Sequence, residues 1–399
     1  MKQTKHLLNM SVKVLRERGM ASLFFRIWHY ISEFARTFLK SGDVLYVSGC
    51  PGGSRFYRCS NQSEELLQYG ITSTVVSQDN ISLLLLSKKF KVFILQRVIH
   101  NDHIKKFIRE VEAQKKTIIF ETDDLVFDPQ YIPQMHYYTY MGEEERSWYD
   151  NGIGREILED SYVSHCVVST KYLADAIKLK YPEKAVFISK NKMNANQVKW
   201  AKNALKKEKE IKKNDGKVRI GYFSGSKSHD NDFDTVSDVL VRVLKENANA
   251  VLVIVGYLKL NGKFADVESQ IEYQAFVPMK RLPELILNVD INIAPLEIDN
   301  PFCQAKSALK FFEAGIVGVP TLATATSSFK DTITHGKDGL LAADENQWHD
   351  CLNKLIKDDG FRIEMGKNAQ KTAVEHYIDT KKHSEINEFV NFLKEKIQK

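Results

Sequence analysis

Hydrophobic and polar positions along this chain follow two patterns that take turns. Short runs of consecutive apolar residues, such as DVLYVSG, KVFILQR and TIIFETDD, are typical of strands that are buried on both faces of a sheet. Between them, stretches such as residues 101–116 place apolar side chains three and four positions apart, which predicts amphipathic helices, here capped by Asn101 or Asp102. This strand–helix order over residues 41–200 predicts a parallel, doubly wound sheet.

The same alternation starts again after a lysine-rich stretch that contains no apolar run. Residues 217–375 include the strand-like runs VRIGYFS, AVLVIVG, DINIAPL and VPTLATA, separated by helix-like segments. The pattern therefore predicts an α/β protein with two Rossmann-like, doubly wound domains that face a cleft. We place these domains at 41–200 and 217–375, with a linker at 201–216 and a last helix in 376–399 that docks back on the body.

The first 40 residues have a composition of their own. They carry eight Lys or Arg and two Glu, so their net charge of +6 equals that of the whole chain. Residues 20–39 repeat apolar and aromatic residues, among them Phe24, Trp28 and Phe34, at helical spacing. A basic amphipathic helix of this kind suits an anionic membrane surface, but it could equally pack on the body of the protein.

The rest of the composition indicates the cellular compartment and restricts the classes of binding partner. No apolar run approaches the roughly 20 residues that cross a bilayer, and no signal peptide is evident. The five cysteines are odd in number and form no C-x-x-C pair, which favours a reducing compartment. We expect a cytoplasmic protein, with residues 1–40 as a peripheral contact to the inner face of the membrane, and no binding to nucleic acid because charge is balanced beyond residue 40.

One candidate site is the turn in IGYFSGSK. Small residues after a strand let the backbone approach an anion closely, and a lysine there adds a point charge. An ordinary turn between strand and helix would look the same. The residues concerned are Gly221, Ser224, Gly225, Ser226 and Lys227.

A second candidate site follows Asn300 and Pro301. The spacing of Lys306, Lys310 and Glu313 predicts that they share one face of a helix. The two ammonium groups would neutralise phosphate, and the carboxylate would accept hydrogen bonds from ribose hydroxyls. The alternative is an ion pair between Lys310 and Glu313 within a solvated helix.

The amino-terminal half offers candidates where its strands end. Gly52, Gly53 and Arg55 follow the first strand, and we expect them on the acceptor side of the cleft. Arg97 follows the strand VFILQ, and the pair Asp123 and Asp124 ends the next strand, where doubly wound sheets bind ligands. The aspartates could instead cap the turn before Leu125. They could also bind a metal, although we expect none.

Several of these motifs together resemble a known family. The turn at 221–227, the segment QAFVPMKRLPELILNVDINIAPL and the pattern K-S-x-L-K-x-x-E-A-G-x-x-G-V-P-T are similar to family-four glycosyltransferases of the GT-B fold. YVSGCPGGSRFYR is similar to the glycine-rich first loop of that fold, and VFILQR and IIFETDDLVFD are similar to a bacterial polysaccharide subgroup. The resemblance covers roughly residues 43–380.

The resemblance implies roles for particular residues. Glu313 matches the second glutamate of a paired motif that holds the ribose, while the main chain at Phe276 and Val277 meets the base. Lys306 and the turn at 224–227 match the diphosphate site, to which we add Asn300, Ser307 and Lys310. The first glutamate of the motif is replaced by Ala305. Gln304 or Asp299 would then have to contact the donor sugar, or activity is lost.

The implied function is a retaining transfer of a sugar from a nucleoside diphosphate sugar to a glycan or lipid-linked glycan. Arg97, Asp123, Asp124 and Lys306 are the expected catalytic group, and no metal or other cofactor is expected. A dinucleotide-dependent oxidoreductase is disfavoured because neither glycine turn has the G-x-G-x-x-G spacing. A catalytically silent scaffold subunit of a glycan-assembly complex remains the alternative, because of Ala305.

Overall fold

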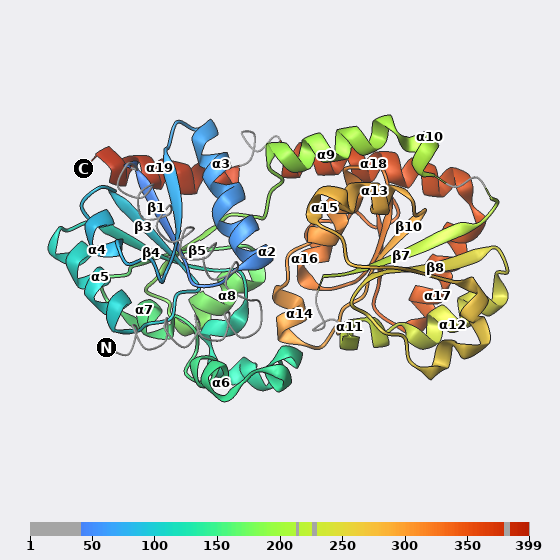
Figure 1. Cartoon of the computed structure of the whole chain (residues 1–399), viewed down its shortest axis with the longest axis horizontal. Helices are drawn as coiled ribbons and strands as arrows, with labels where there is room; N and C mark the ends of the chain where they lie inside the picture. Colours follow the sequence, from blue (N-terminus) through green and yellow to red (C-terminus); the bar gives the residue numbers. More distant parts are fainter. Residues whose placement is uncertain (1–40, 213–214, 226–229, 379–383, 399) are drawn as a thin grey trace, which may run out of the picture.

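The computed structural model describes residues 41–212, 215–225, 230–378 and 384–398. Two parallel six-stranded sheets lie side by side, each with helices on both faces (Figure 1). The predicted helix at 20–39 falls outside the described residues. Among the residues described, no helix is both long and apolar enough to cross a membrane.

The first sheet has the order β2-β1-β3-β4-β5-β6. Its strands are β1 (Val44–Ser48), β2 (Ser73–Ser77), β3 (Val92–Gln96), β4 (Thr117–Thr122), β5 (His165–Val168) and β6 (Ala185–Ile188). From β1 the chain adds β2 on one side and then β3 to β6 on the other, so the order in which strands are added reverses between β1 and β3. All of these strands remain parallel. The sequence analysis did not predict β6, whose four residues are only partly buried.

Helices connect these strands and cover the sheet. They are α2 (Gly52–Arg55), the π-helix η1 (Phe56–Asn61), α3 (Gln62–Gln68), α4 (Leu83–Leu86), α5 (Asp102–Ala113), the 3-10 helices η2 (Leu125–Phe127), η3 (Pro129–Gln134) and η4 (His136–Tyr140), α6 (Glu143–Asp150), α7 (Arg155–Glu159) and α8 (Lys171–Lys180). The predicted cap of α5 is Asn101, whose side chain accepts from the backbone of His103 and Ile104.

The second sheet has the order β12-β11-β10-β7-β8-β9. Its strands are β7 (Val218–Ser224), β8 (Ala250–Gly256), β9 (Ile271–Gln274), β10 (Ile291–Ala294), β11 (Thr321–Thr324) and β12 (Leu340–Ala342). This is the order of a dinucleotide-binding doubly wound sheet, with the reversal between β7 and β10. The short edge strand β12 was not predicted.

The remaining helices surround the second sheet or bridge to the first. They are α9 (Ala195–Lys206), α10 (Glu208–Ile211), α11 (Asp230–Asp234), α12 (Ser237–Glu246), η6 (Gly262–Gln270), η7 (Met279–Arg281), α13 (Leu282–Leu287), α14 (Pro301–Ala305), α15 (Leu309–Gly315), α16 (Ser327–Lys330), α17 (Glu345–Lys357), α18 (Asp359–Tyr377) and α19 (Ser384–Gln398).

Each sheet buries both faces because successive side chains of a strand point to opposite sides. In β1, Leu45 and Val47 enter one core, whereas Val44 and Tyr46 enter another core that also contains α19. The second sheet likewise separates a core around α12 and α17 from one around α15 and α18. The consecutive apolar runs in the sequence are therefore explained by burial on both faces.

The chain crosses between the two halves twice. After β6 it runs into α9, which packs against α13 beside the second sheet, and after α18 it returns so that α19 covers the first sheet (Figure 1). Phe389 and Leu393 of α19 are fully buried there. The last helix thus docks on the opposite half. The boundaries at 200 and 217 stay a prediction.

Candidate functional site

The candidate site of the second half lies at the reversal of its sheet. Ligands of doubly wound sheets bind beyond the carboxyl ends of the strands at this point. Here β7 ends at Ser224 and leads toward α11, while β10 ends at Ala294 and leads to α14 and α15. The segment from Asn300 to Glu313 therefore borders the predicted position for a nucleotide.

The predicted single helix carrying Lys306, Lys310 and Glu313 is wrong. Helix α14 ends at Ala305, Lys306 has an extended backbone, and α15 begins only at Leu309. Contacts with the first half are made at this break. The Thr170 hydroxyl donates to the Ala305 carbonyl (3.2 Å), and Asn191 Nδ2 donates to Ser307 Oγ (2.7 Å).

Lys306 nevertheless belongs to a charged cluster. Its ammonium donates to Asp232 Oδ2 at 2.9 Å, and the Cys303 thiol lies 3.2 Å from Asp232 Oδ1. Burial opposes the charge on Lys306, but the neighbouring Asp232 outweighs it and raises the pKa of this lysine. Lys306 is therefore a fixed cation, held by an aspartate of α11 that comes 74 residues earlier.

Lys310 is the second cation of this cluster. Its ammonium lies 4.2 Å from the centre of the Tyr222 ring, a cation–π contact with a residue of β7. Burial lowers the pKa of Lys310 to about 8, a change that Asp232 opposes and Lys306 reinforces. Lys310 therefore has an ammonium that a bound phosphate would stabilise further.

Glu313 lies one turn further along α15 and faces the first half of the chain. The Tyr57 hydroxyl, from η1, donates to Glu313 Oε1, and Gln197 Nε2 donates to the Tyr57 oxygen at 2.8 Å. Burial raises the pKa of Glu313, against the hydrogen bond from Tyr57 and the charge of Lys310. The alternative of a solvated Lys310–Glu313 pair does not fit, because each side chain has a different partner.

The same region contains a group of possible metal ligands. Asp232, Glu297 and Cys303 each offer a ligand atom, and these atoms lie within 4.8 Å of one another. The Lys306 ammonium already pairs with Asp232 at this point, and burial raises the pKa of the Cys303 thiol to about 12, which disfavours the thiolate that a metal needs. The expected absence of a metal stays a prediction.

The glycine turn is only partly described, because Ser226 and Lys227 lie outside the described residues. Gly221 is inside β7, where a Cβ would come within 2.9 Å of Val289, so packing explains the absence of a side chain. Ser224 is the last residue of β7, and Gly225 follows it at the surface. The phosphate-binding role of this turn stays a prediction.

The predicted base-binding segment presents an aromatic surface. Phe276 is 53% exposed and stacks on Tyr257 with ring centroids 5.1 Å apart, while Val277 is half-buried. Tyr257 follows β8, a strand next to β7. Two exposed stacked rings at this edge offer a platform for a flat, aromatic ligand group.

Residues around the motif position of Ala305 have structural partners. Asn300 caps α14 by accepting from Phe302 N at 3.0 Å, and it also donates to Gln134 O at 3.1 Å. Gln304 donates to Ile298 O and accepts from Ser327 N at 2.8 Å, so both ends of its amide bind main chain. Asp299 remains exposed, which leaves it as the better substitute for the missing glutamate.

Arg97 and Asp123 form a network at the carboxyl ends of β3 and β4. Arg97 Nη1 lies 3.4 Å from Asp123 Oδ1, and Ser54 donates to Asp123 Oδ2 at 2.6 Å. Arg97 has a left-handed backbone (φ 47°), unusual for a residue with a side chain. A Cβ at Gly49 would lie 1.9 Å from the Arg97 carbonyl oxygen, so glycine is required for the two loops to meet.

Asp124 caps the turn before Leu125, which was one of the alternatives for the two aspartates. Its side chain accepts from Leu125 N at 3.0 Å at the start of η2, and burial raises the pKa of its carboxyl against the charge of Arg97. Beside this network, Gly52 has a left-handed backbone (φ 77°), and Gly53 is exposed. Arg55 ends α2 and is half-buried.

The structure brings the two halves of the candidate site together. The charges of Asp124 and Lys306 interact across the junction, and Tyr57 reaches Glu313. The sequence analysis missed Tyr57, Ser54 and the role of Asp232. The acidic start of α11 was visible in the sequence, but no local signal pairs Tyr57 with a residue 256 positions away.

Comparisons with known proteins agree with this arrangement. Residues 204–372 match the family described as glycosyl transferases group 1. A D-inositol 3-phosphate glycosyltransferase from Corynebacterium jeikeium (strain K411) is 41% identical over 63 residues, and the match spans only 15% of either chain.

Solved structures resemble the chain over most of its length. Anabaena Alr3699/HepE in complex with UDP and glucose has a TM-score of 0.58 and 12% identity, and the match covers 90% of this chain and 99% of that one. A glycosyltransferase from Rickettsia africae ESF-5 has a TM-score of 0.61, 11% identity and the same coverages. Sucrose-phosphate synthase from Thermosynechococcus elongatus has a TM-score of 0.58 and 12% identity, over 84% and 95% of the chains. At these identities the likeness concerns the fold.

Proposed function

We propose that this chain, a glycosyltransferase of the GT-B fold with a group 1 glycosyl transferase domain at residues 204–372, transfers a sugar from a nucleoside diphosphate sugar to a glycan or lipid-linked glycan. The donor binds the second half of the chain and the acceptor binds the first. The anomeric configuration of the sugar is retained.

The observation that carries this proposal is the pair of cations, Lys306 and Lys310, at the reversal of the second sheet. Lys306 pairs with Asp232, whose charge also acts on Lys310, and Glu313 is the next polar residue along α15. Diphosphate would meet the lysines while the ribose hydroxyls donate to Glu313, and the stacked rings of Tyr257 and Phe276 accommodate the base. The Anabaena protein in complex with UDP and glucose supports a donor of this class.

In the transfer, negative charge develops on the leaving diphosphate as its bond to the sugar breaks. Lys306 and Lys310 stabilise that charge from fixed positions, which lowers the barrier because the cations need not reorganise. Across the junction, Arg97 and Asp123 hold one another beside Asp124, whose charge interacts with that of Lys306. We assign this amino-terminal group to the acceptor side, together with Gly52, Gly53 and Arg55.

A silent scaffold subunit is the second candidate, and the replacement at Ala305 favours it. Ala305 is fully buried and cannot contact a donor sugar, while neighbouring Gln304 is held by main-chain groups at both ends. The scaffold proposal requires that donor binding survives without turnover. Under the enzyme proposal, Asp299 or a main-chain group replaces the missing glutamate.

The test uses the purified full chain with UDP-, GDP- and dTDP-sugars. Ligand at about 100 times its dissociation constant adds roughly 2.7 kcal/mol to stability, which a thermal-shift screen detects. Donor hydrolysis by the sugar that stabilises the protein then separates the two candidates. Stabilisation with hydrolysis supports the enzyme, stabilisation without hydrolysis or transfer supports the scaffold, and no stabilisation by any donor contradicts both.

A further inference from the structure

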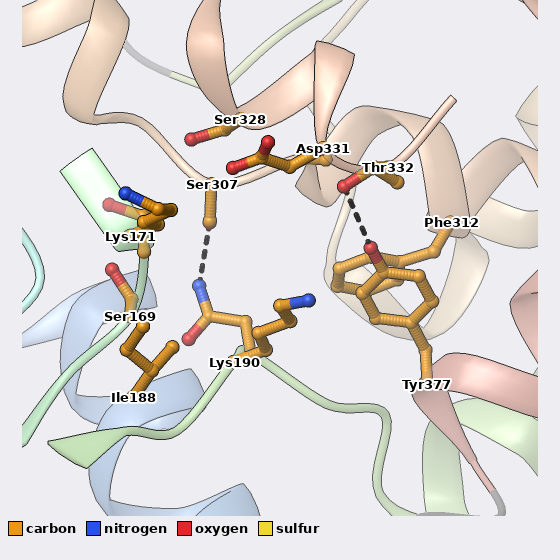
Figure 2. A pocket seen from close by; sticks show the side chains of 13 residues that line it. Ser169, Lys171, Ile188, Lys190, Ser307, Phe312, Ser328, Asp331, Thr332 and Tyr377 are labelled. Carbon is orange, nitrogen blue, oxygen red and sulfur yellow. Dashed lines mark hydrogen bonds between the residues drawn. The ribbon is translucent and has the colours of Figure 1, made fainter. Parts of the chain in front are cut away.

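A second cavity lies at the junction of the two halves, on the other side of the break between α14 and α15. Its volume is 280 Å³, and Figure 2 shows the side chains around it. The break separates it from the donor cluster. Lys306 points to Asp232, whereas the next residue, Ser307, lines the cavity and binds Asn191.

The walls come from both halves of the chain. Ser169 and Thr170 follow β5, and Ile188 to Asn191 lead out of β6 into the first crossover. Tyr377 ends α18 just before the second crossover. The cavity therefore lies where the two halves meet, beside the first crossover and the end of α18.

Hydroxyl groups make up an unusual share of this lining. They belong to Ser169, Thr170, Ser307, Ser328, Thr332 and Tyr377. Ser169 is 2% exposed, yet its Oγ has no hydrogen-bond partner among the described residues. A buried hydroxyl without a partner is costly, so it suits a ligand that brings its own polar groups.

The rest of the lining combines an aromatic wall with charged groups of both signs. The rings of Phe312 and Tyr377 stack with centroids 4.2 Å apart. Lys190 and Asp331 lie around the same space as Ser307 (Figure 2). Lys171 also lines the cavity, but its ammonium pairs with Asp175 at 2.6 Å. Charged groups of both signs, rather than a cluster of one sign, favour an uncharged ligand with many hydroxyls over an anion.

We propose that this junction cavity binds one hexose-type sugar ring, either free or at the end of a glycan, at a site separate from the nucleotide. The sugar hydroxyls bond Ser169, Asp331 and Lys190, and the apolar face of the ring packs on the aromatic wall. Because the walls come from both halves, the bound sugar stabilises the relative placement of the halves seen in this structure. The site does not depend on donor turnover.

The experiment is saturation-transfer NMR on the full chain with glucose, methyl glucoside, maltose and, as the charged comparison, glucuronate. We expect an uncharged sugar to bind with a Kd of about 1 mM or tighter, and saturating UDP to leave that signal in place. Preference for glucose over its glycosides assigns a free sugar, and equal or better binding of the glycosides assigns a glycan end. Preference for glucuronate, or displacement by UDP, overturns the proposal.

Variants locate the binding. Asp331→Asn removes a charged acceptor on an exposed residue and should weaken binding about tenfold. The matched control is Asp350→Asn at an exposed position of α17, outside the cavity, which should leave binding unchanged. Ser169→Ala removes one neutral hydroxyl at a buried position and should weaken sugar binding about fivefold. Circular dichroism checks the fold of each variant. Absence of any sugar signal, or equal behaviour of Asp331→Asn and Asp350→Asn, contradicts the site.

Discussion

Tyr57 of the first half donates its hydroxyl to the carboxylate of Glu313 in the second half, across 256 residues of sequence. Tyr57 is almost fully buried and also accepts a hydrogen bond from Gln197. The residue that we propose to hold the donor ribose is thus already bonded to the opposite half. If Glu313 holds the ribose as we propose, donor binding and the placement of the two halves are physically connected at one carboxylate.

The first prediction separates the two roles of this contact. Glu313→Ala removes a charged acceptor for the ribose, which contributes about 1.5–3 kcal/mol, so donor affinity should fall by one to two orders of magnitude. Tyr57→Phe keeps the carboxylate and should weaken the donor much less. Calorimetry with the nucleoside diphosphate measures both. Equal losses would mean that Glu313 acts only through the junction.

The second prediction concerns Lys306. Lys306→Ala should weaken nucleoside diphosphate by roughly one to two orders of magnitude and leave the nucleoside unaffected, because the lysine meets only phosphate. It also removes one ion-pair partner of the buried Asp232, at a cost of about 1–3 kcal/mol in stability. A double variant that combines Lys306→Ala and Asp232→Asn should be more stable than Lys306→Ala alone, but it should not regain diphosphate affinity. Lys371→Ala, exposed on α18, is the control, and a parallel loss of nucleoside binding would contradict the assignment.

The third prediction is a pH dependence set by Lys310. Because burial lowers the pKa of Lys310 to about 8, its ammonium is present below pH 8 and is lost above it. A bound diphosphate raises that pKa, so affinity should fall as pH rises above 8, by up to about tenfold per pH unit. Lys306, whose pKa is raised, should stay charged over this range. The Lys310→Met protein should bind diphosphate more weakly, with an affinity that does not change with pH. A wild-type affinity that stays constant from about pH 7 to 10 would exclude Lys310 from the phosphate site.

The fourth prediction is that transfer survives EDTA, because Lys306 and Lys310 supply the positive charge. The measurement is donor consumption with and without chelator. Activity that is lost and then restored by magnesium or manganese would contradict this. Asp232, Glu297 and Cys303 would then be the first ligands to test, before Asp123 and Asp124.

The fifth prediction concerns residues 1–40, which lie outside the described part of the chain. Each basic residue near an anionic surface contributes about 1 kcal/mol, so the full chain should bind anionic liposomes at low salt. A protein that starts at Gly42 should stay soluble and folded but lose this binding. Aggregation of the shortened protein would instead favour packing of the segment on the body, and a full chain that ignores the liposomes would exclude the membrane interpretation.

The fold class and the approximate position of the candidate donor site could be predicted from the sequence alone. Apolar runs such as KVFILQR are local signals, since a strand that is buried on both faces must be apolar at nearly every position. The resemblance around Glu313 was likewise contained in one short segment, and the family match at residues 204–372 includes it. The short, partly exposed strand β6 was missed because four residues carry too little of this pattern.

Only the tertiary structure decided which side chains meet. The helix break at Lys306 could not be predicted from spacing, because it depends on Thr170 and Asn191 of the other half binding Ala305 and Ser307. For the same reason the partners of Lys306 and Glu313, Asp232 and Tyr57, had no local signature. Helical periodicity describes bonds between near neighbours in sequence, whereas a junction between domains is formed by groups that only folding brings together.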